Sequence, residues 1–282
     1  MGFAMPSSPF LKRGMRVSGI YLCAVALTLF LVGPYLWMVI SSVSPERELI
    51  STPPHWFPEE PTLERYKGLI GTVQFKRALF NSLVITSLTV VVTLLFGSLA
   101  AYASARFSFR GRTQFLFSVL VTQMLPRAAI IIPLYVILGS CGLRDSRLGL
   151  IIVYTGFFLP VVIWILRSYF ITIPTEIEEA AIVDGCSRVR TLFQVILPLA
   201  KPALFATGAY AFLSAWNEFF FALILTSYKA KTLTVLTTEF STQGGIDYGM
   251  MTTAGVLGSL IPIVLALLFQ KYVVKGLTAG WT

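Results

Sequence analysis

The sequence predicts an all-α integral membrane protein with six transmembrane helices. Of its 282 residues, 56% are hydrophobic and 12% are charged, and the mean hydropathy is +0.78. Soluble domains carry about 25% charged residues, so this low share is typical of a chain that lies in lipid. Six apolar stretches each reach the roughly 20 residues that a spanning helix needs.

The six expected spans differ in the charges they contain. Four have none, one contains only Arg127, and one contains only Glu218. The expected spans are about residues 17–44, 78–105, 113–142, 148–166, 202–228 and 248–270. They form one transmembrane domain, residues 17–275, between short tails at 1–16 and 276–282.

The distribution of Lys and Arg predicts the orientation of the chain. The N-terminal tail, the connector at 104–113 and the segment from Lys271 onward are short and dense in basic residues, which favour the cytoplasmic side. We therefore expect both termini in the cytoplasm, together with the longer segment 167–201. The formal net charge of +9 then reflects topology. The sequence shows no basic face interleaved with aromatic residues, so its positive charge does not indicate nucleic-acid binding.

The segment 167–201 has the pattern of two short helices joined by a turn. Thr175 followed three residues later by Glu178 is a capping-box pattern, so we expect a helix to begin at Thr175. Gly185 can adopt a left-handed conformation and end that helix. The hydroxyl of Ser187 is a suitable N-cap for a second helix.

The same segment resembles the cytoplasmic loop of permease subunits in binding-protein-dependent ABC importers. The matching residues are Glu179, Ala180, Ala181, Gly185, Leu197 and Pro198. The resemblance covers nearly the whole chain, including Trp216-Asn217-Glu218 in the fifth span. Within that family the chain is similar to the carbohydrate branch, which includes the maltose-type permeases. It implies the type I ABC importer permease fold, with a cytoplasmic coupling helix in this loop.

The resemblance also implies an assembly. In that family the coupling helix docks into a separate ATPase subunit, which assigns the six matching residues to coupling. The implied partners are a second homologous permease, two copies of an ABC ATPase subunit, an external or periplasmic solute-binding protein, a sugar or oligosaccharide substrate, and the lipid of a bacterial inner cell membrane. No Gly-Lys-Ser/Thr phosphate loop occurs here, so ATP and Mg are expected on the ATPase. We expect no catalytic residue, metal site or cofactor in this chain.

Arg127, Asn217 and Glu218 are polar groups within expected spans. An ionisable side chain there costs about 2.5–3.5 kcal/mol on insertion scales and needs water, a partner or a function. We assign all three to the translocation pathway. Arg127 stands where the resembled family commonly has a small or apolar residue, and its guanidinium suits the carboxylate or phosphate of an acidic sugar. Snorkelling to the membrane surface and an ion pair with Glu218 are alternatives, as is a helix-stabilising contact for Asn217 and Glu218.

Two other classes of protein are weaker interpretations. An ion-coupled carrier or channel acting alone would show paired inverted repeats or several intramembrane carboxylates, whereas Glu218 is the one carboxylate within the expected spans. A membrane enzyme would need clustered catalytic groups, but His55 is the single histidine. Sugar uptake by this chain alone in vesicles would favour the carrier.

Overall fold

The structure is a computed structural model that describes residues 9–53, 55–242 and 245–278. Nearly all of its regular structure is helical, as the composition predicts. The described residues form two compact units, one within 1–69 and 240–256 and the other within 70–239 and 257–282. The helix α14 contributes to both units.

The first unit contains three helices from the start of the chain, a short strand pair and the start of α14. Its elements are α1 (Pro9–Val43), α2 (Glu46–Leu49), α3 (Glu64–Gly71), β1 (Ser241–Thr242), β2 (Gly245–Ile246) and the first residues of α14 (Tyr248–Thr278). Hydrogen bonds to the residues at the end of α1 connect the helices of this unit. Arg65 of α3 donates to the carbonyl of Ser44, and Thr253 of α14 donates to that of Ser42 at 3.3 Å.

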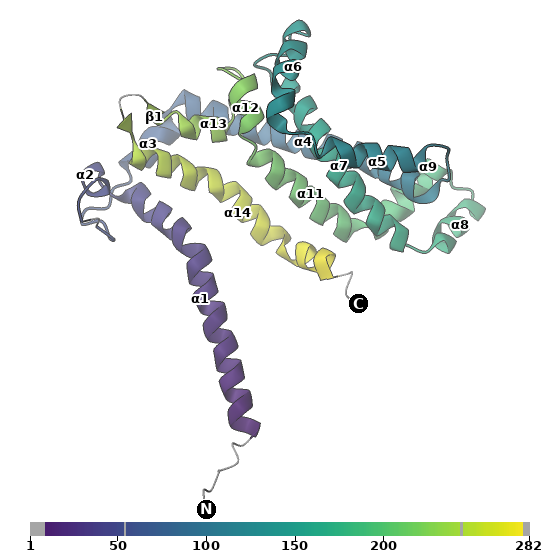
Figure 1. Cartoon of the computed structure of the whole chain (residues 1–282), viewed down its shortest axis with the longest axis horizontal. Coiled ribbons are helices and arrows are strands. Elements are labelled where there is room, and N and C mark those ends of the chain that lie inside the picture. The colour runs from purple at the N-terminus through teal and green to yellow at the C-terminus, as the bar shows by residue number, and fades with distance from the viewer. Residues whose placement is uncertain (1–8, 54, 243–244, 279–282) are drawn as a thin grey trace, which may run out of the picture. The chain divides into compact units, whose positions relative to one another are not determined.

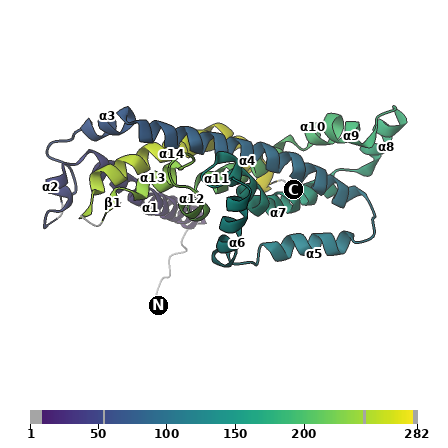
Figure 2. The same cartoon turned by 90° about the horizontal axis from the view of Figure 1, so that it is seen from above.

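The second unit is organised around two long helices, α4 (Val73–Arg106) and α7 (Arg147–Thr172). They lie side by side, and α11 (Lys201–Trp216) packs against both (Figure 1, Figure 2). Gly97 permits the close approach of α4 to α7, because a Cβ at this position would lie 2.6 Å from a methyl carbon of Val162. Tyr154 and Phe170 on α7 are fully buried in the resulting core.

Shorter elements connect these long helices. In chain order they are α5 (Arg112–Thr122), α6 (Arg127–Ser140), α8 (Thr175–Val183), α9 (Arg188–Thr191), the π-helical turn η1 (Leu192–Ile196), α10 (Leu197–Leu199), α12 (Phe220–Leu225) and α13 (Leu233–Thr238). Helix α13 lies between the expected fifth and sixth spans. Its residues Leu233, Val235 and Leu236 are buried, so packing rather than composition orders this segment.

Among the described residues, four helices are long and apolar enough to cross a membrane. They are Val17–Val43, Val73–Arg106, Arg147–Thr172 and Tyr248–Gln270. Two further apolar pairs are bent: Arg112–Thr122 with Arg127–Ser140 by 97°, and Arg188–Leu199 with Lys201–Trp216 by 84°. The structure holds up to six spans if each bent pair is one span.

The stretches expected as the third and fifth spans are not continuous helices. In 113–142 the helix is interrupted before Pro126, which lacks an N–H and disfavours helical backbone in the preceding residue. In 202–228, α11 ends at Trp216, and α12 begins at Phe220. The polar pair Asn217 and Glu218 therefore lies in a break between helices rather than inside one.

The loop between α6 and α7 is joined to the segment after α12 by one carboxylate. Asp145 has a left-handed backbone with φ of 48°, and its N–H donates to the carbonyl of Leu225 at 3.1 Å. The side-chain oxygens of Asp145 accept four backbone N–H groups at 2.9–3.1 Å. The donors are Ser227, Tyr228, Lys229 and Ala230.

A buried amide on α4 holds the same segment from its other side. The Nδ2 of Asn81 donates to the carbonyls of Lys229 and Lys231 at 2.9 and 2.8 Å. Its Oδ1 accepts from Nε of Arg147 at 2.7 Å. Ser82 adds a bond from the backbone N–H of Leu233 at 2.8 Å. These bonds fix residues 227–233 against the first turns of α4.

The four donors determine the titration of Asp145. Partial burial raises the pKa of its carboxyl, but the N–H groups of Lys229, Ser227, Ala230 and Tyr228 outweigh burial, and the pKa lies below its usual range. A carboxyl with a depressed pKa stabilises the folded state fully above its unfolded value, about 3.9. That contribution is lost as the pH falls through the folded-state pKa.

Asp145→Asn tests this junction. We expect the free energy of unfolding to fall by about 1–3 kcal/mol at neutral pH, because the amide nitrogen cannot accept an N–H. The difference from wild type should shrink as the pH falls through the folded-state pKa. Thermal unfolding of the detergent-solubilised protein measures both effects. Asp184→Asn is the control, since Asp184 is exposed, and equal melting temperatures for the two variants would contradict the assignment.

Candidate functional site

The residues that match the family loop lie in a helix–turn–helix at one end of α4 and α7, hereafter the 174–199 segment (Figure 1). Its first helix, α8, begins at Thr175 as expected. The expected capping box is absent, however: Pro174 is the N-cap, and no side-chain hydrogen bond caps the helix. The carboxylate of Glu178, which the capping box would have turned back to the helix N-terminus, is directed to another helix.

Glu178 joins α8 to the end of α4 through a buried ion pair. Its Oε1 pairs with Nε of Arg106, and both side chains are less than a tenth exposed. Tyr102 donates its hydroxyl to Oε2 of Glu178 at 3.1 Å, and Nη2 of Arg106 donates to the carbonyl of Ile173 at 2.7 Å. Burying two charges is costly unless they are paired and further hydrogen-bonded, as these are.

The role of Arg106 corrects the sequence interpretation. Its position in a short basic connector suggested an exposed positive-inside anchor, yet its side chain is 8% exposed and pairs with Glu178. The two residues lie 72 positions apart. No local pattern links residues at that separation, so neither was assigned to the site from sequence.

The turn after α8 has the hydrogen bonds of a Schellman motif. The N–H of Gly185 donates to the carbonyl of Ile182 at 2.9 Å, and that of Cys186 to Ala181 at 3.0 Å. Gly185 has φ of +87°, which confirms the expected left-handed turn. The hydroxyl of Ser187 accepts from the N–H of Arg190, which confirms the expected N-cap.

The second half of the segment is anchored in the core. Residues Arg188–Leu199 run through a π-helical turn, Leu192–Ile196, just before Pro198. Leu192 and Ile196 are fully buried and pack with Leu166 and Phe170 of α7. Both halves of the segment are therefore fixed to long helices, the first through an ion pair and the second through apolar packing.

The tip of the segment projects apolar surface. Val183 is 86% exposed, and Ile177 and Val189 are also exposed. Of the matched residues, Glu179 and Ala180 face outward, whereas Ala181 is buried against the chain itself. Gly185 and Pro198 are exposed, and Leu197 is partly buried. A rigid, mostly exposed projection of this kind is suited to contact another protein.

The polar residues of the expected spans form a second group. Glu218 is buried, and its carboxylate accepts the N–H groups of Phe221 and Ala222 at 3.0 and 3.2 Å, which starts α12. Arg127 is the first residue of α6, and its side chain is 53% exposed. Its Nη1 lies 3.9 Å from Oε1 of Glu218, at the outer limit of an ion pair.

The geometry separates the roles of these residues. Glu218 uses both oxygens locally, as a helix cap, which explains how a buried carboxylate is accommodated. Arg127 is left with a loose contact and an accessible guanidinium. Asn217 is exposed beside them, at the end of α11. No cluster of His, Cys, Asp and Glu suited to a metal occurs in the part of the chain that the structure describes.

The chain belongs to the family of binding-protein-dependent transport system inner membrane components, whose model matches residues 93–279. It is 37% identical over 274 residues to the trehalose/maltose transport system permease protein MalG of Thermococcus litoralis, covering 96% of each chain. It is 36% identical to the sulfoquinovosyl glycerol transport system permease protein SmoH of Agrobacterium fabrum, covering 93% of this chain and 94% of that protein.

Two further comparisons extend this result. The diacetylchitobiose uptake system permease protein DasC of Streptomyces coelicolor is 34% identical, covering 91% of this chain and 94% of that protein. A chain of a bacterial ABC transporter involved in the import of the acidic polysaccharide alginate superposes with a TM-score of 0.77 at 24% identity, covering 95% of this chain and 99% of that chain. The expected type I importer permease fold is confirmed, and the chain is an inner-membrane transport permease.

Glu178→Gln tests the attachment of α8. We expect a loss of about 3–5 kcal/mol in stability, because Arg106 would remain buried without its counter-charge. Amide hydrogen exchange of residues 175–183 should accelerate at the same time. The double variant Arg106→Gln/Glu178→Gln should recover part of the loss. Glu176→Gln, an exposed change on the same helix, is the control, and unchanged exchange in the Glu178→Gln variant would refute the attachment.

Proposed function

We propose that this chain is the permease subunit of an ATP-driven, binding-protein-dependent importer of a sugar or oligosaccharide. The names of its relatives support the substrate class, since trehalose, maltose, sulfoquinovosyl glycerol and diacetylchitobiose all contain sugar units. Its working partners are a second, homologous permease, two copies of an ABC ATPase that hold ATP and Mg, and an external solute-binding protein. Both termini and the 174–199 segment face the cytoplasm in this proposal.

The observation that carries the proposal is the rigid mounting of the 174–199 segment. Its exposed tip docks on the ATPase, and closure of the ATPase pair moves the tip. The Glu178–Arg106 ion pair transfers that displacement to α4, while Leu192 and Ile196 transfer it to α7. Two attachments make the helices move with the segment as rigid bodies instead of letting it swing.

The matched residues have distinct tasks in this docking. Glu179 and Ala180 contact the ATPase directly, since both are exposed. Ala181 is small enough for α8 to lie close to its own chain, and Gly185 supplies the left-handed backbone that ends α8. Leu197 and Pro198 position the second helix at the membrane side of the docking surface.

A cysteine at the tip tests the docking. In a background with Cys23, Cys141 and Cys186 replaced, Val183→Cys should crosslink to the ATPase in the assembled complex. Arg144→Cys, at the far end of α7, should not. A crosslink from both positions or from neither would contradict the proposal, and so would sugar uptake by this chain without the ATPase.

The Gly185 turn offers a second test of coupling. Gly185→Ala places a side chain at φ of +87°, which costs about 1–2 kcal/mol, although nothing lies within 4 Å of the added Cβ. We expect ATP-driven uptake to fall severalfold while assembly of the complex persists. Gly68→Ala is the matched control, because that position is helical and open. Equal uptake by both variants would argue against a role for the turn.

We propose acidic sugars as the substrate subclass, on the basis of Arg127. Its side chain is half exposed and lies at the bend between α5 and α6, and its guanidinium has a distant contact with Glu218 and lies 6.0 Å from the ring centre of Phe221. An accessible guanidinium favours a carboxylate or sulfonate in the solute through charge-assisted hydrogen bonds. A neutral sugar would gain little from it.

Substitution of Arg127 distinguishes the two substrate classes. Arg127→Ala should raise the KM for an anionic oligosaccharide by roughly tenfold to a hundredfold, which corresponds to the about 1.5–3 kcal/mol of a charged hydrogen bond. Neutral maltooligosaccharide uptake should change little, and Arg127→Lys should retain part of the anionic uptake. Equal losses for both solutes, or unchanged anionic uptake, would exclude charge recognition.

A further inference from the structure

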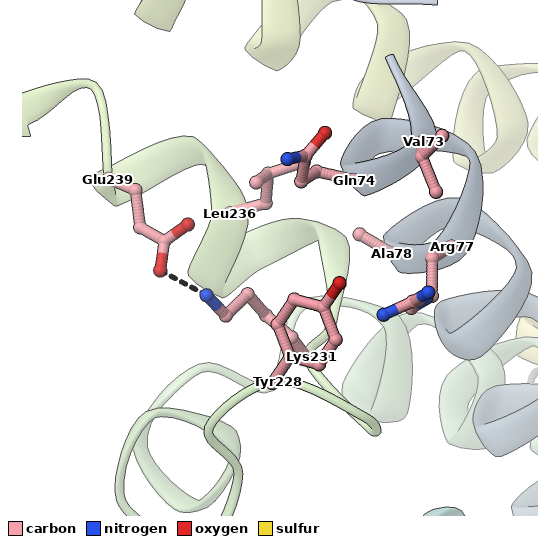
Figure 3. A pocket seen from close by; sticks show the side chains of 8 residues that line it. All are labelled: Val73, Gln74, Arg77, Ala78, Tyr228, Lys231, Leu236 and Glu239. Atoms are coloured by element: carbon pink, nitrogen blue, oxygen red, sulfur yellow. Dashed lines mark hydrogen bonds and ion pairs between the residues drawn. The ribbon is translucent and has the colours of Figure 1, made fainter.

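A small pocket lies at the opposite end of α4 from the 174–199 segment. Its volume is about 50 Å³. Gln74, Arg77 and Ala78 of α4 line one side, and Tyr228, Lys231 and Glu239 line the other, as Figure 3 shows. The pocket residue Arg77 and the ion-paired Arg106 therefore lie near the two ends of one helix, roughly 40 Å apart at 1.5 Å per residue.

Arg77 is the basic residue of this pocket that can still bind an anionic group. Its guanidinium carbon lies 4.5 Å from the centre of the Tyr228 ring, which is within the range of a cation–π interaction. Among the described residues, no acidic side chain pairs with Arg77. Lys231, in contrast, is paired with Glu239 (Figure 3). Lys231 thereby neutralises the carboxylate that would otherwise compete for Arg77.

The pocket is preorganised by the bonds already described around Asp145 and Asn81. The carboxylate of Asp145 holds the backbone of residues 227–230, and Asn81 holds the carbonyls of Lys229 and Lys231. The backbone that carries Tyr228 and Lys231 is therefore fixed before any partner binds. A preorganised site loses little entropy on binding, so a single added ion pair can contribute usefully to affinity.

Charge and size define what the pocket accepts. Lys76 and Lys229 are exposed next to the lining residues in sequence, so the surroundings are positive. Arg77 would pair with a carboxylate through two parallel hydrogen bonds. On this measure a cavity needs about 10–15 Å³ to hold one water, so a volume of about 50 Å³ has room for a few small groups. This space is sufficient for the end of an acidic side chain.

We propose that this pocket receives an aspartate or glutamate side chain of the external solute-binding protein, with Arg77 as its direct partner. The inference rests on the proposed function, which places this end of α4 outside the membrane. The binding protein then contacts one end of α4, and the ATPase acts on the other end through α8, which the Glu178–Arg106 ion pair joins to α4. Occupation of the outer pocket and docking of the 174–199 segment thus act on the same helix.

Binding measurements on Arg77 variants test the proposal. The complete transporter is placed in nanodiscs, and its affinity for the sugar-loaded solute-binding protein encoded with this chain is measured. Arg77→Glu should weaken binding at least tenfold, and Arg77→Gln by a smaller factor. Arg77→Lys should retain part of the affinity, because a point charge remains but the bidentate geometry is lost. Co-purification of the ATPase with each variant verifies assembly.

Arg144→Glu is the matched control. Arg144 also stacks on a tyrosine, 4.0 Å from the ring centre of Tyr135, but lies outside the pocket. Its reversal should change the affinity less than twofold. One Asp→Arg or Glu→Arg substitution on the binding protein should restore affinity to the Arg77→Glu transporter, and that substitution would identify the docked side chain.

Three results would overturn the proposal. They are unchanged binding in the Arg77 variants, equal losses for Arg77→Glu and Arg144→Glu, and a loss that follows the anionic lipid content of the nanodisc. The last result would indicate a lipid headgroup as the occupant. Each leaves the proposed function standing, because ATPase-dependent sugar uptake and the Val183→Cys crosslink test that function separately.

Discussion

The buried ion pair between Arg106 and Glu178 is the interaction on which the function of this fold depends. Two charges removed from water are tolerated only while they remain in contact and keep their further bonds to Tyr102 and Ile173. Helix α8 cannot leave α4 without leaving each charge without its partner. The projecting 174–199 segment is therefore fixed to α4 and is not a flexible loop.

The other end of α4 is fixed by a different kind of interaction. At that end the carboxylate of Asp145 accepts four backbone N–H groups, and Asn81 binds the carbonyls that follow them. A backbone segment with little regular structure thereby gains the hydrogen bonds that a helix would have supplied internally. Helix α4 thus connects two polar junctions across an apolar core in which Gly97 allows close packing with α7.

The middle of the second unit shows why polar residues are tolerated there. Pro126 and the Asn217-Glu218 pair both lie in breaks between helices, where backbone groups lose their partners in the adjacent turn. Glu218 compensates for its own break by capping α12. Arg127 lies at the outer limit of an ion pair with Glu218 and 6.0 Å from the ring centre of Phe221, and its side chain is 53% exposed.

Sequence alone determined the membrane class, the helical fold, the turn at Gly185 and the cap at Ser187, because apolar length and local backbone chemistry act over a few residues. The capping box failed because Glu178 gains more from Arg106 than from a backbone N–H. Only the tertiary structure decided the roles of Glu178, Arg106, Asp145 and Arg77. Their partners lie far away in the chain, and the packing of α4 with α7 brings them together.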